Sequence, residues 1–180
     1  PGERFDVYLA GDGMTGEDLA SLQALCHRAG GELHPVAVPA DAFAGAPVIR
    51  YYSRAMYYRL LAAQLLPDTL DKALYLDPDV LIINRVRPLY ETDLGPMLCA
   101  AATHEGLTGM SSQIARIRLS TPEARAYFNS GVLMMNLSQM RRDVHPQQVF
   151  DYADRNRAAL ILPDQDILNA LYGKRILPLD

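Results

Sequence analysis

The chain has 180 residues, 49% of them hydrophobic and 21% charged, so it is long and apolar enough to bury the core of one domain. A net charge of −4 and a pI near 5.5 exclude the basic surface that nucleic-acid-binding proteins usually carry. No apolar stretch reaches the roughly 18 residues of a spanning helix, and no signal segment opens the chain, so we expect no membrane span.

The first part of the chain has the pattern of a strand, a helix and a second strand. Residues 5–10 alternate apolar and polar as a half-buried strand does, and Thr15 with Asp18 resembles a capping box at a helix start. Leucines recur at helical spacing until Gly30 ends the helix, and residues 33–38 follow as a strand. Because strands joined by a helix usually pair in parallel, this unit predicts an α/β fold.

The rest of the chain is predicted to continue a single domain spanning residues 1–180, because no repeat or linker interrupts it. Helices are predicted at 53–66, 147–156 and 164–171, with Ser138 capping a further short helix. Strand patterns occur at 73–76, 79–83, 97–102, 130–137 and 175–179. Between residues 104 and 121 the periodicity fades, which predicts a long functional loop or a poorly ordered insertion.

The two cysteines are predicted to be free thiols. Cys26 lies in the first helical pattern and Cys99 lies in an apolar run, which favours two buried thiols over a disulfide or a reactive site. Free thiols are typical of a reducing compartment, so we expect a cytoplasmic protein.

Asp77 and Asp79 stand one residue apart inside an otherwise apolar run, directly after the predicted strand KALYL. Asp is disfavoured in strands, and a buried carboxylate needs a counter-charge or a metal. In an extended segment the two side chains share a face, and Pro78 between them restricts the backbone. Two such carboxylates suit Mg²⁺ or Mn²⁺. The alternative is a polar turn without a metal, because a bare D-x-D pattern also arises by chance.

Three segments resemble, in order and approximate spacing, the central motifs of family 8 glycosyltransferases, which include bacterial lipopolysaccharide galactosyl- and glucosyltransferases and the glycogenins. They are YYRLLAAQLLPDTLDKALYLDPDVLI, YFNSGVLMMNL and LPDQDILNALY. The resemblance implies a GT-A fold, in which helices flank a Rossmann-like mixed α/β sheet. It also implies that galactose or glucose is transferred from a UDP-sugar with retention of anomeric configuration, and with Mn²⁺ or Mg²⁺ as cofactor. The acceptor would be a glycan or a lipid-linked saccharide such as lipopolysaccharide.

The resemblance assigns roles to individual residues. Metal binding is implied for Asp77 and Asp79. Contacts with the donor are implied for Arg59, Asp77, Asn129, Ser130, Asp164 and Gln165. Without the family, Arg59 would be interpreted as a solvated helical arginine, Asn129 as a loop residue, and Asp164 as a helix-capping residue.

Asp164 and Gln165 match the pair beside the anomeric carbon and are therefore the expected catalytic residues. A double displacement needs a carboxylate nucleophile, and Gln165 at the matching place is a feeble one. We therefore expect departure and attack on the same face of the sugar through an oxocarbenium-like state. Gln165 and Asp164 would stabilise the positive charge there, with Asp166 as structural support.

Two parts of the family pattern have no match in these residues. The family has an earlier strand that helps to bind uridine, and a histidine beyond the last helix that is a third metal ligand. None of His27, His34, His104 and His145 lies where that ligand belongs. The chain is therefore expected to be a partial domain, and any peripheral contact with the inner membrane face would come from regions outside it.

Two alternatives remain open at this point. One is a catalytically silent module of the same fold that binds a metal or a nucleotide sugar. The other is a haloacid-dehalogenase-type phosphohydrolase, which also places D-x-D after an apolar strand. That class expects a small Thr or Gly pair soon after the second Asp, whereas residues 80–82 here are Val, Leu and Ile.

Overall fold

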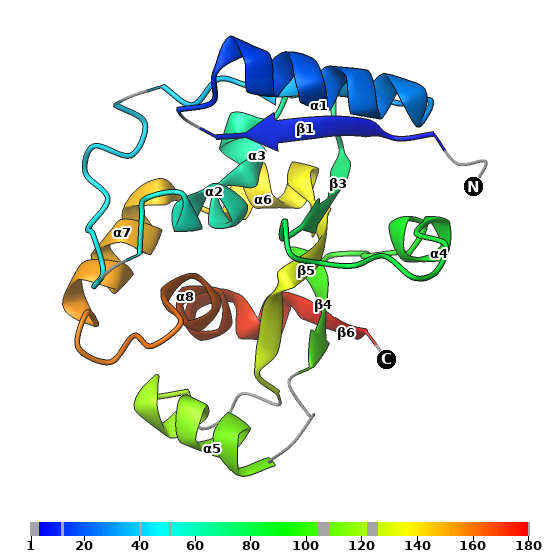
Figure 1. The fold of residues 1–180 in the computed structure, drawn as a ribbon. Helices are drawn as coiled ribbons and strands as arrows, with labels where there is room; N and C mark the ends of the chain where they lie inside the picture. The colour runs from blue at the N-terminus through cyan, green and yellow to red at the C-terminus, as the bar shows by residue number, and fades with distance from the viewer. Residues whose placement is uncertain are drawn as a thin grey trace.

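The computed structural model describes residues 4–11, 13–39, 41–50, 52–103, 109–121 and 126–179. Within them the strands are β1 (Asp6–Ala10), β2 (Glu32–Val36), β3 (Lys72–Leu76), β4 (Cys99–Thr103), β5 (Phe128–Asn136) and β6 (Ile176–Leu179). The helices are α1 (Gly16–Arg28), α2 (Met56–Leu60), α3 (Ala62–Leu65), α4 (Arg87–Tyr90), α5 (Gly109–Arg118), α6 (Leu137–Asp143), α7 (Pro146–Arg155) and α8 (Pro163–Tyr172). Figure 1 shows their arrangement. The prediction of an α/β fold is confirmed.

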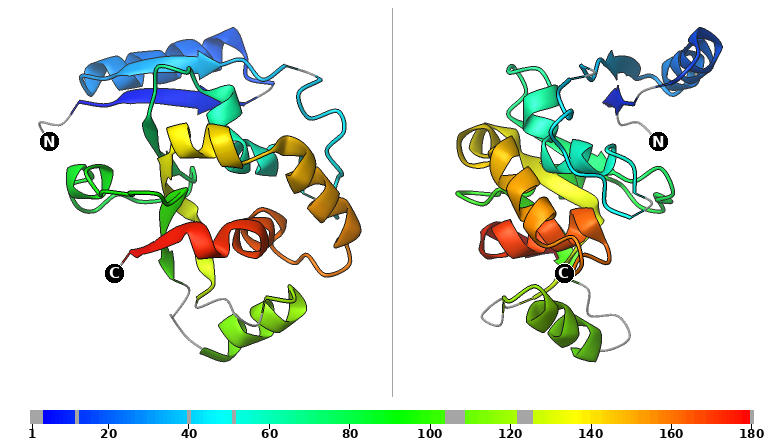
Figure 2. Two further views of the ribbon diagram at one scale, coloured as in Figure 1. Left: turned by 180° about the vertical axis from the view of Figure 1, so that it is seen from behind. Right: turned by 90° about the vertical axis from the view of Figure 1, so that its left-hand side faces the viewer.

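The strands form two sheets. β1 and β2 pair in parallel, as the strand–helix–strand pattern predicts. A mixed sheet has the order β3-β5-β4-β6, in which β5 is antiparallel to both neighbours and β6 is parallel to β4. In the described residues no strand pairing joins β1 or β2 to this sheet, and the first unit lies to one side of the body in both views of Figure 2.

The first helix begins where the sequence predicts. Thr15 accepts a hydrogen bond from the backbone N–H of Asp18 at 3.1 Å, while the Asp18 carboxylate accepts from the Thr15 N–H at 3.0 Å. This is a capping box, which satisfies two backbone donors that the helix leaves unpaired. Gly30 follows the last turn with a φ of +83°, a conformation that a side chain disfavours.

The main core lies between the mixed sheet and the helices α2, α3, α6, α7 and α8, which cover one face of that sheet in Figure 1. Alternate residues of β5 point to opposite faces: Leu133 and Met135 enter the main core, and Met134 enters a smaller cluster with Leu89 and Tyr90 of α4. Both faces of β5 are therefore buried here, which explains the continuous apolar run at residues 132–135. No helix in the described ranges is long and apolar enough to cross a membrane.

Three local predictions are wrong. The helix predicted over 53–66 is two short helices that meet at Leu61, where φ is −114° and ψ is 23°. The four consecutive residues 60–63 at this junction are all buried. A single straight helix would point some of them to solvent, whereas the break allows all four to face the core. Residues 79–83 form a turn and an irregular segment, and Leu81 is 82% exposed. Asn136, and not Ser138, caps α6 by accepting from the Gln139 N–H.

The prediction of irregular structure over 104–121 also needs correction, because residues 109–118 form the helix α5. Residues 104–108 of that stretch lie outside the described residues. Ala115 and Leu119 are buried, while Ile114 and Ile117 are exposed, so the apolar residues do not mark one buried face. This explains why periodicity fails to identify the helix.

Candidate functional site

Arg59 of α2 joins two of the predicted site carboxylates, Asp77 and Asp164, which are far apart in the sequence. Its Nη2 lies 2.8 Å from Oδ1 of Asp77, just past β3, and its Nη1 lies 3.0 Å from Oδ2 of Asp164, in the first turn of α8. The side chains are only 16%, 23% and 12% exposed, respectively. A buried guanidinium with two carboxylates is a strong structural constraint, because removing either sign leaves an unpaired charge. Arg59 is therefore not a solvated helical arginine.

The start of β5 meets α8 through side-chain hydrogen bonds. The Ser130 hydroxyl donates to Asp164 at 2.9 Å, and the Ser130 backbone N–H donates to Oε1 of Gln165 at 3.1 Å. Asn169 adds a two-way clamp, since its amide accepts from the Phe128 N–H and donates to the Phe128 carbonyl. Ser130, Asp164, Gln165 and Asn169 are all buried. The expected catalytic pair is thus held against the end of a central strand.

Asp164 does not cap α8. The cap residue is Leu162, without a side-chain hydrogen bond, and Pro163 occupies the first turn. Pro163 is suited to that position because it has no N–H to leave unpaired. The Asp164 carboxylate is thereby left to bind Arg59 and Ser130.

Asp77 is held by a tyrosine that the sequence prediction did not include. Tyr75 of β3 lies two residues before Asp77, whose N–H still bonds to the Gly131 carbonyl of β5, and the Tyr75 hydroxyl donates to Oδ1 of Asp77 at 2.6 Å. The guanidinium of Arg59 stacks on the Tyr75 ring, 4.9 Å from its centroid. Burial, together with this bond to Asp77, raises the pKa of Tyr75. The alternation of β3 was the signal that could have identified it.

Gly131 leaves space beside Asp77. A Cβ atom at this position would lie 2.9 Å from Oδ2 of Asp77 and 3.1 Å from Oδ1 of Asn129. Asn129 uses that oxygen to accept from the Gly131 N–H at 2.8 Å. A glycine inside a strand often marks a close approach of this kind, so the Gly in FNSGVL was a usable signal.

Neither Asp77 nor Asp79 lies within a strand, because β3 ends at Leu76. The N–H of Val80 bonds to the carbonyl of Asp77 at 3.1 Å, which closes a turn around Pro78 and Asp79. The argument from strand alternation therefore does not apply to the pair, although both carboxylates follow β3. Asp79 is exposed.

A group of three potential metal ligands lies elsewhere in the described part of the chain. It consists of Asp6, Glu32 and His34 on β1 and β2, whose ligand atoms are within 4.8 Å of one another. Both carboxylates are exposed, and none of these residues belongs to the predicted D-x-D site.

Asp166 lies beneath the site and is fully buried. Arg118 of α5 binds it with both terminal nitrogens at 2.8 Å, and the Tyr127 hydroxyl donates to it at 2.6 Å. The backbone N–H groups of Ile161 and Leu162 donate to the same carboxylate at 2.7 and 3.1 Å. Burial tends to raise the pKa of Asp166, but the hydrogen bonds from Arg118 and Tyr127 outweigh it and keep that pKa below its ordinary value.

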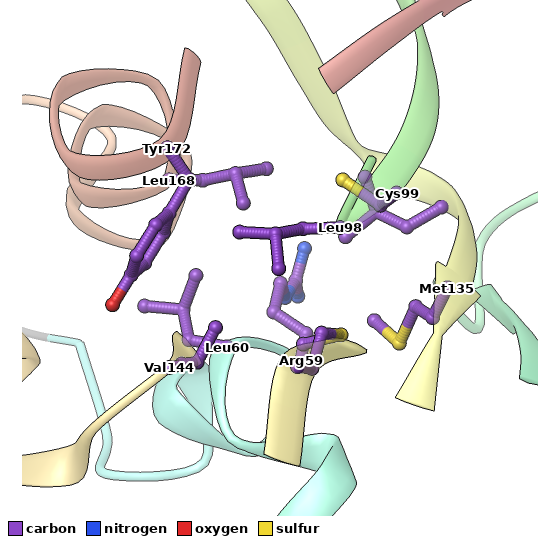
Figure 3. Close-up of a pocket in the computed structure, with 10 residues that line it drawn as sticks. Arg59, Leu60, Leu98, Cys99, Met135, Val144, Leu168 and Tyr172 are labelled. Atoms are coloured by element: carbon purple, nitrogen blue, oxygen red, sulfur yellow. The ribbon is translucent and has the colours of Figure 1, made fainter. Parts of the chain in front are cut away.

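The inner side of Arg59 borders a small apolar cavity of about 10 Å³, shown in Figure 3. Leu98, Cys99, Met135 and Tyr172 are among its walls. The Nε atom of Arg59 is buried and has no hydrogen-bond partner among the residues that the structure describes. The cavity is at the lower limit for a single water molecule and cannot hold a sugar. The candidate chemistry of Arg59 therefore lies at its terminal nitrogens, which contact Asp77 and Asp164.

A larger hollow of about 530 Å³ lies between the β1–β2 pair and the end of α3. Its walls include Tyr8, His34, Val36, Leu65 and Asp68. None of the predicted site residues lines it, so this larger hollow is not the candidate site.

The charge balance of the site favours a cation. Arg59 is shared between Asp77 and Asp164, so the cluster carries excess negative charge even before the nearby Asp79 is counted. A bare diphosphate would be repelled there, whereas a divalent cation with oxygen ligands would be attracted.

Comparison with known proteins agrees with this geometry. A lipopolysaccharide 1,2-glucosyltransferase of Escherichia coli K12 is 36% identical over 126 residues, which are 69% of this chain and 36% of that protein. General stress protein A of Bacillus subtilis is 23% identical over 92% of this chain and 57% of its own length. The chain thus spans about half or less of the length of these curated relatives.

Solved structures give the same result. The galactosyltransferase LgtC, in complex with donor and acceptor sugar analogues, superposes with a TM-score of 0.79 at 30% identity, covering 98% of this chain and 62% of LgtC. GlyE of Streptococcus pneumoniae, at 22% identity and a TM-score of 0.69 over 97% of this chain and 38% of GlyE, shares the fold. The neighbours confirm the predicted GT-A architecture. The family described as Glycosyl transferase family 8 matches residues 3–180, which excludes the phosphohydrolase alternative, and the chain belongs to that family.

Proposed function

We propose that this chain carries the donor site of a retaining glycosyltransferase that moves galactose or glucose from a UDP-sugar to lipopolysaccharide or a related glycan. The observation that carries the proposal is Arg59, which holds Asp77 and Asp164 together at the end of β3. The first D-x-D carboxylate and the expected sugar-binding carboxylate are thereby brought into one largely buried cluster, and the exposed Asp79 lies two residues along the chain from it. The E. coli relative, a lipopolysaccharide glucosyltransferase, supports this choice of acceptor.

The residues present are compatible with a divalent cation. Oδ1 of Asp77 accepts from Arg59 and Tyr75, whereas Oδ2 accepts from Arg59 and keeps a second lone pair. The missing side chain of Gly131 leaves this oxygen accessible. Asp77 and Asp79 would hold Mn²⁺ or Mg²⁺, since both ions take carboxylate oxygens. Such an ion, when bound, neutralises the charge that develops on the departing diphosphate.

The sugar end of the site is assigned to Asn129, Ser130, Asp164 and Gln165. Amide and hydroxyl groups can both donate to and accept from hexose hydroxyls, and a carboxylate can accept from them. The Ser130 N–H already occupies one lone pair of Gln165 Oε1, so that oxygen can present its other lone pair to a developing positive charge. Asp164, held by Arg59 and Ser130, supplies a fixed negative charge beside it.

The hydrogen bonds that occupy Asp164 and Asp166 support retention without a covalent intermediate, because they leave neither carboxylate free to act as a nucleophile. Asp166 accepts five hydrogen bonds, counting both from Arg118, and has no lone pair left to attack an anomeric carbon. Asp164 is engaged by Arg59 and Ser130. We therefore assign attack and departure to the same face of the sugar. A glycosyl adduct trapped on Asp164 or Asp166 with a slow donor would contradict this assignment.

The decisive experiment is calorimetric titration of UDP into the chain with and without Mn²⁺. The double variant Asp77→Ala/Asp79→Ala tests the two carboxylates. The matched control is Asp151→Ala/Asp154→Ala, which removes the same charge from exposed pairs on α7. We expect binding that needs Mn²⁺, is lost in the first variant and survives in the control.

UDP binding that is independent of both Mn²⁺ and the two carboxylates would overturn the metal site. Binding without hexose transfer, measured with UDP-galactose and UDP-glucose on lipopolysaccharide acceptors, would instead favour a silent binding module. Both donors are tested because pocket contacts to single hydroxyl groups decide between such sugars.

A further inference from the structure

We propose that Arg118 is a positioning residue for this site: by binding Asp166 and the chain before α8, it holds Tyr127 and Gln165 in their places. The inference rests on the proposed function for the importance of Gln165, but its structural part can be tested separately. Arg118 lies at the end of α5, and within the described part of the chain its contacts are with Asp166 and Ala159 and not with the D-x-D residues.

Arg118 binds both the first turn of α8 and the segment that precedes it. Its two terminal nitrogens bind the two oxygens of Asp166, each at 2.8 Å, and one of them also donates to the carbonyl of Ala159. The Arg118 side chain is 19% exposed and Asp166 is 0% exposed. A bidentate pair of this kind fixes direction as well as distance, because the planar guanidinium matches both carboxylate oxygens.

Asp166, which Arg118 holds in place, also binds the chain at the start of α8 and at the start of β5. On one side it accepts from the N–H groups of Ile161 and Leu162, which set where α8 begins. On the other side it accepts from the Tyr127 hydroxyl, at the entrance to β5. The carboxylate therefore joins three segments, α5, the start of α8 and the start of β5, of which two carry the expected sugar-binding residues.

Gln165 lies between these fixed points. Its Oε1 accepts from the Ser130 N–H, its backbone carbonyl accepts from Asn169, and its side chain is also a hydrogen-bonding neighbour of the Tyr127 hydroxyl. A side-chain amide can rotate when only its oxygen or only its NH₂ group has a hydrogen-bond partner. The Ser130 N–H holds the oxygen of the Gln165 amide, and Tyr127 holds its other end. Because Asp166 orients the Tyr127 hydroxyl, it helps to fix the direction of the whole amide.

The first test variant is Tyr127→Phe, which removes one hydroxyl and leaves the Arg118–Asp166 pair intact. Its matched control is Tyr172→Phe, since Tyr172 is also a buried tyrosine, but its hydroxyl donates to Gln148 and not to this network. The readout is solvent exchange of the Gln165 side-chain NH₂ group by ¹⁵N NMR, with the signal assigned from its loss in Gln165→Glu.

We expect the Gln165 amide to exchange about fivefold to tenfold faster in Tyr127→Phe, as for the loss of one hydrogen bond, and to be unchanged in the control. In transfer assays, Tyr127→Phe should lower kcat by about tenfold to hundredfold, because small misplacements of reacting groups have such effects. The Kd for UDP with Mn²⁺ should change less than about twofold, because the diphosphate end is held by other residues.

A second pair of variants tests Arg118 itself. Arg118→Met leaves a buried carboxylate unpaired and is expected to destabilise the fold, so it is compared with Arg118→Met/Asp166→Asn, which restores neutrality. The double variant should fold and should still show the faster exchange of Gln165. Equal exchange in wild type, Tyr127→Phe and the double variant would overturn the positioning role. If the amide responds while wild type transfers no hexose, the positioning holds and the proposed function fails.

Discussion

Arg59 contacts Asp77 with both ends of its guanidinium: Nη2 lies 2.8 Å from Oδ1, and Nη1 lies 3.1 Å from Oδ2. Nη1 reaches Asp164 as well, at 3.0 Å. A lysine could not reproduce this contact, because an ammonium is a single point and cannot match two oxygens of one carboxylate. The arrangement explains why an arginine stands on a helix that is otherwise apolar on its inner side.

We predict that Arg59→Met lowers the free energy of unfolding by about 3–5 kcal/mol, because two largely buried carboxylates lose their counter-charge. Arg59→Lys should recover part of the stability but not Mn²⁺-dependent UDP binding. Urea denaturation and calorimetry measure the two effects. The control is Arg87→Met, which breaks an exposed pair with Glu91 and should cost no more than about 1 kcal/mol. Equal losses in Arg59→Met and Arg87→Met would contradict the prediction.

Gly131→Ala tests whether the space beside Asp77 is functional. The new Cβ would lie 2.9 Å from Oδ2 of Asp77, so either the carboxylate or the strand must shift. We expect a loss of stability of about 1–3 kcal/mol, typical of overpacking, and at least about tenfold weaker UDP binding with Mn²⁺. Gly173→Ala is the control, because nothing lies within 4 Å of its Cβ position. Unchanged UDP affinity in Gly131→Ala would show that the space has no role in binding.

The sequence predicted those elements whose signals are local. The capping box at Thr15 and the glycine after α1 specify one helix, and the apolar runs specify β3, β4 and β5. The segment at 79–83 misled the prediction because its β-branched residues Val80, Ile82 and Ile83 have strand propensity, yet no strand of the described chain pairs with them. Propensity alone cannot supply a partner strand.

The helix α5 was not predicted, because its sequence lacks a clear local signal. Its exposed Ile114 and Ile117 hide the helical period, and its last turn is anchored by Arg118 to Asp166. That contact joins residues far apart in sequence, so no local window contains it. The candidate site likewise contains one contact that local sequence could predict and another that it could not. Tyr75 could have been predicted from strand alternation with Asp77, whereas the bridge from Arg59 to Asp164 depends on how α2 and α8 pack.

The two cysteines should differ sharply in reactivity. Burial raises the pKa of the Cys99 thiol to about 12, so at pH 8 only about one molecule in ten thousand carries the thiolate. Cys26 is half-buried on α1. We expect a disulfide reagent such as DTNB to modify one thiol per native chain and two in urea. Cys26→Ser should abolish the native reaction, and rapid modification of that variant would contradict the burial of Cys99.

Asp166→Asn should change how stability depends on pH. The pKa of Asp166 is lower in the folded chain than its ordinary value, so the folded state binds fewer protons near acid pH than the unfolded state. Its contribution is therefore fully present above the ordinary pKa of 3.8 and is lost as the pH falls through the lower, folded value. We expect Asp166→Asn to be less stable than wild type by about 3–5 kcal/mol at pH 7, with the difference shrinking below pH 4.

Urea denaturation at pH 7, 5 and 3 measures this difference. Asp151→Asn is the matched control, because Asp151 forms an exposed pair with Arg155 and its removal should change stability by less than about 1 kcal/mol at each pH. The network of Asp166 with Arg118 and Tyr127 links α5 to α8, so its loss at low pH should also make α5 unfold first. A wild-type advantage over Asp166→Asn that persists undiminished at pH 3 would contradict the assignment of a charged, multiply hydrogen-bonded carboxylate at this position.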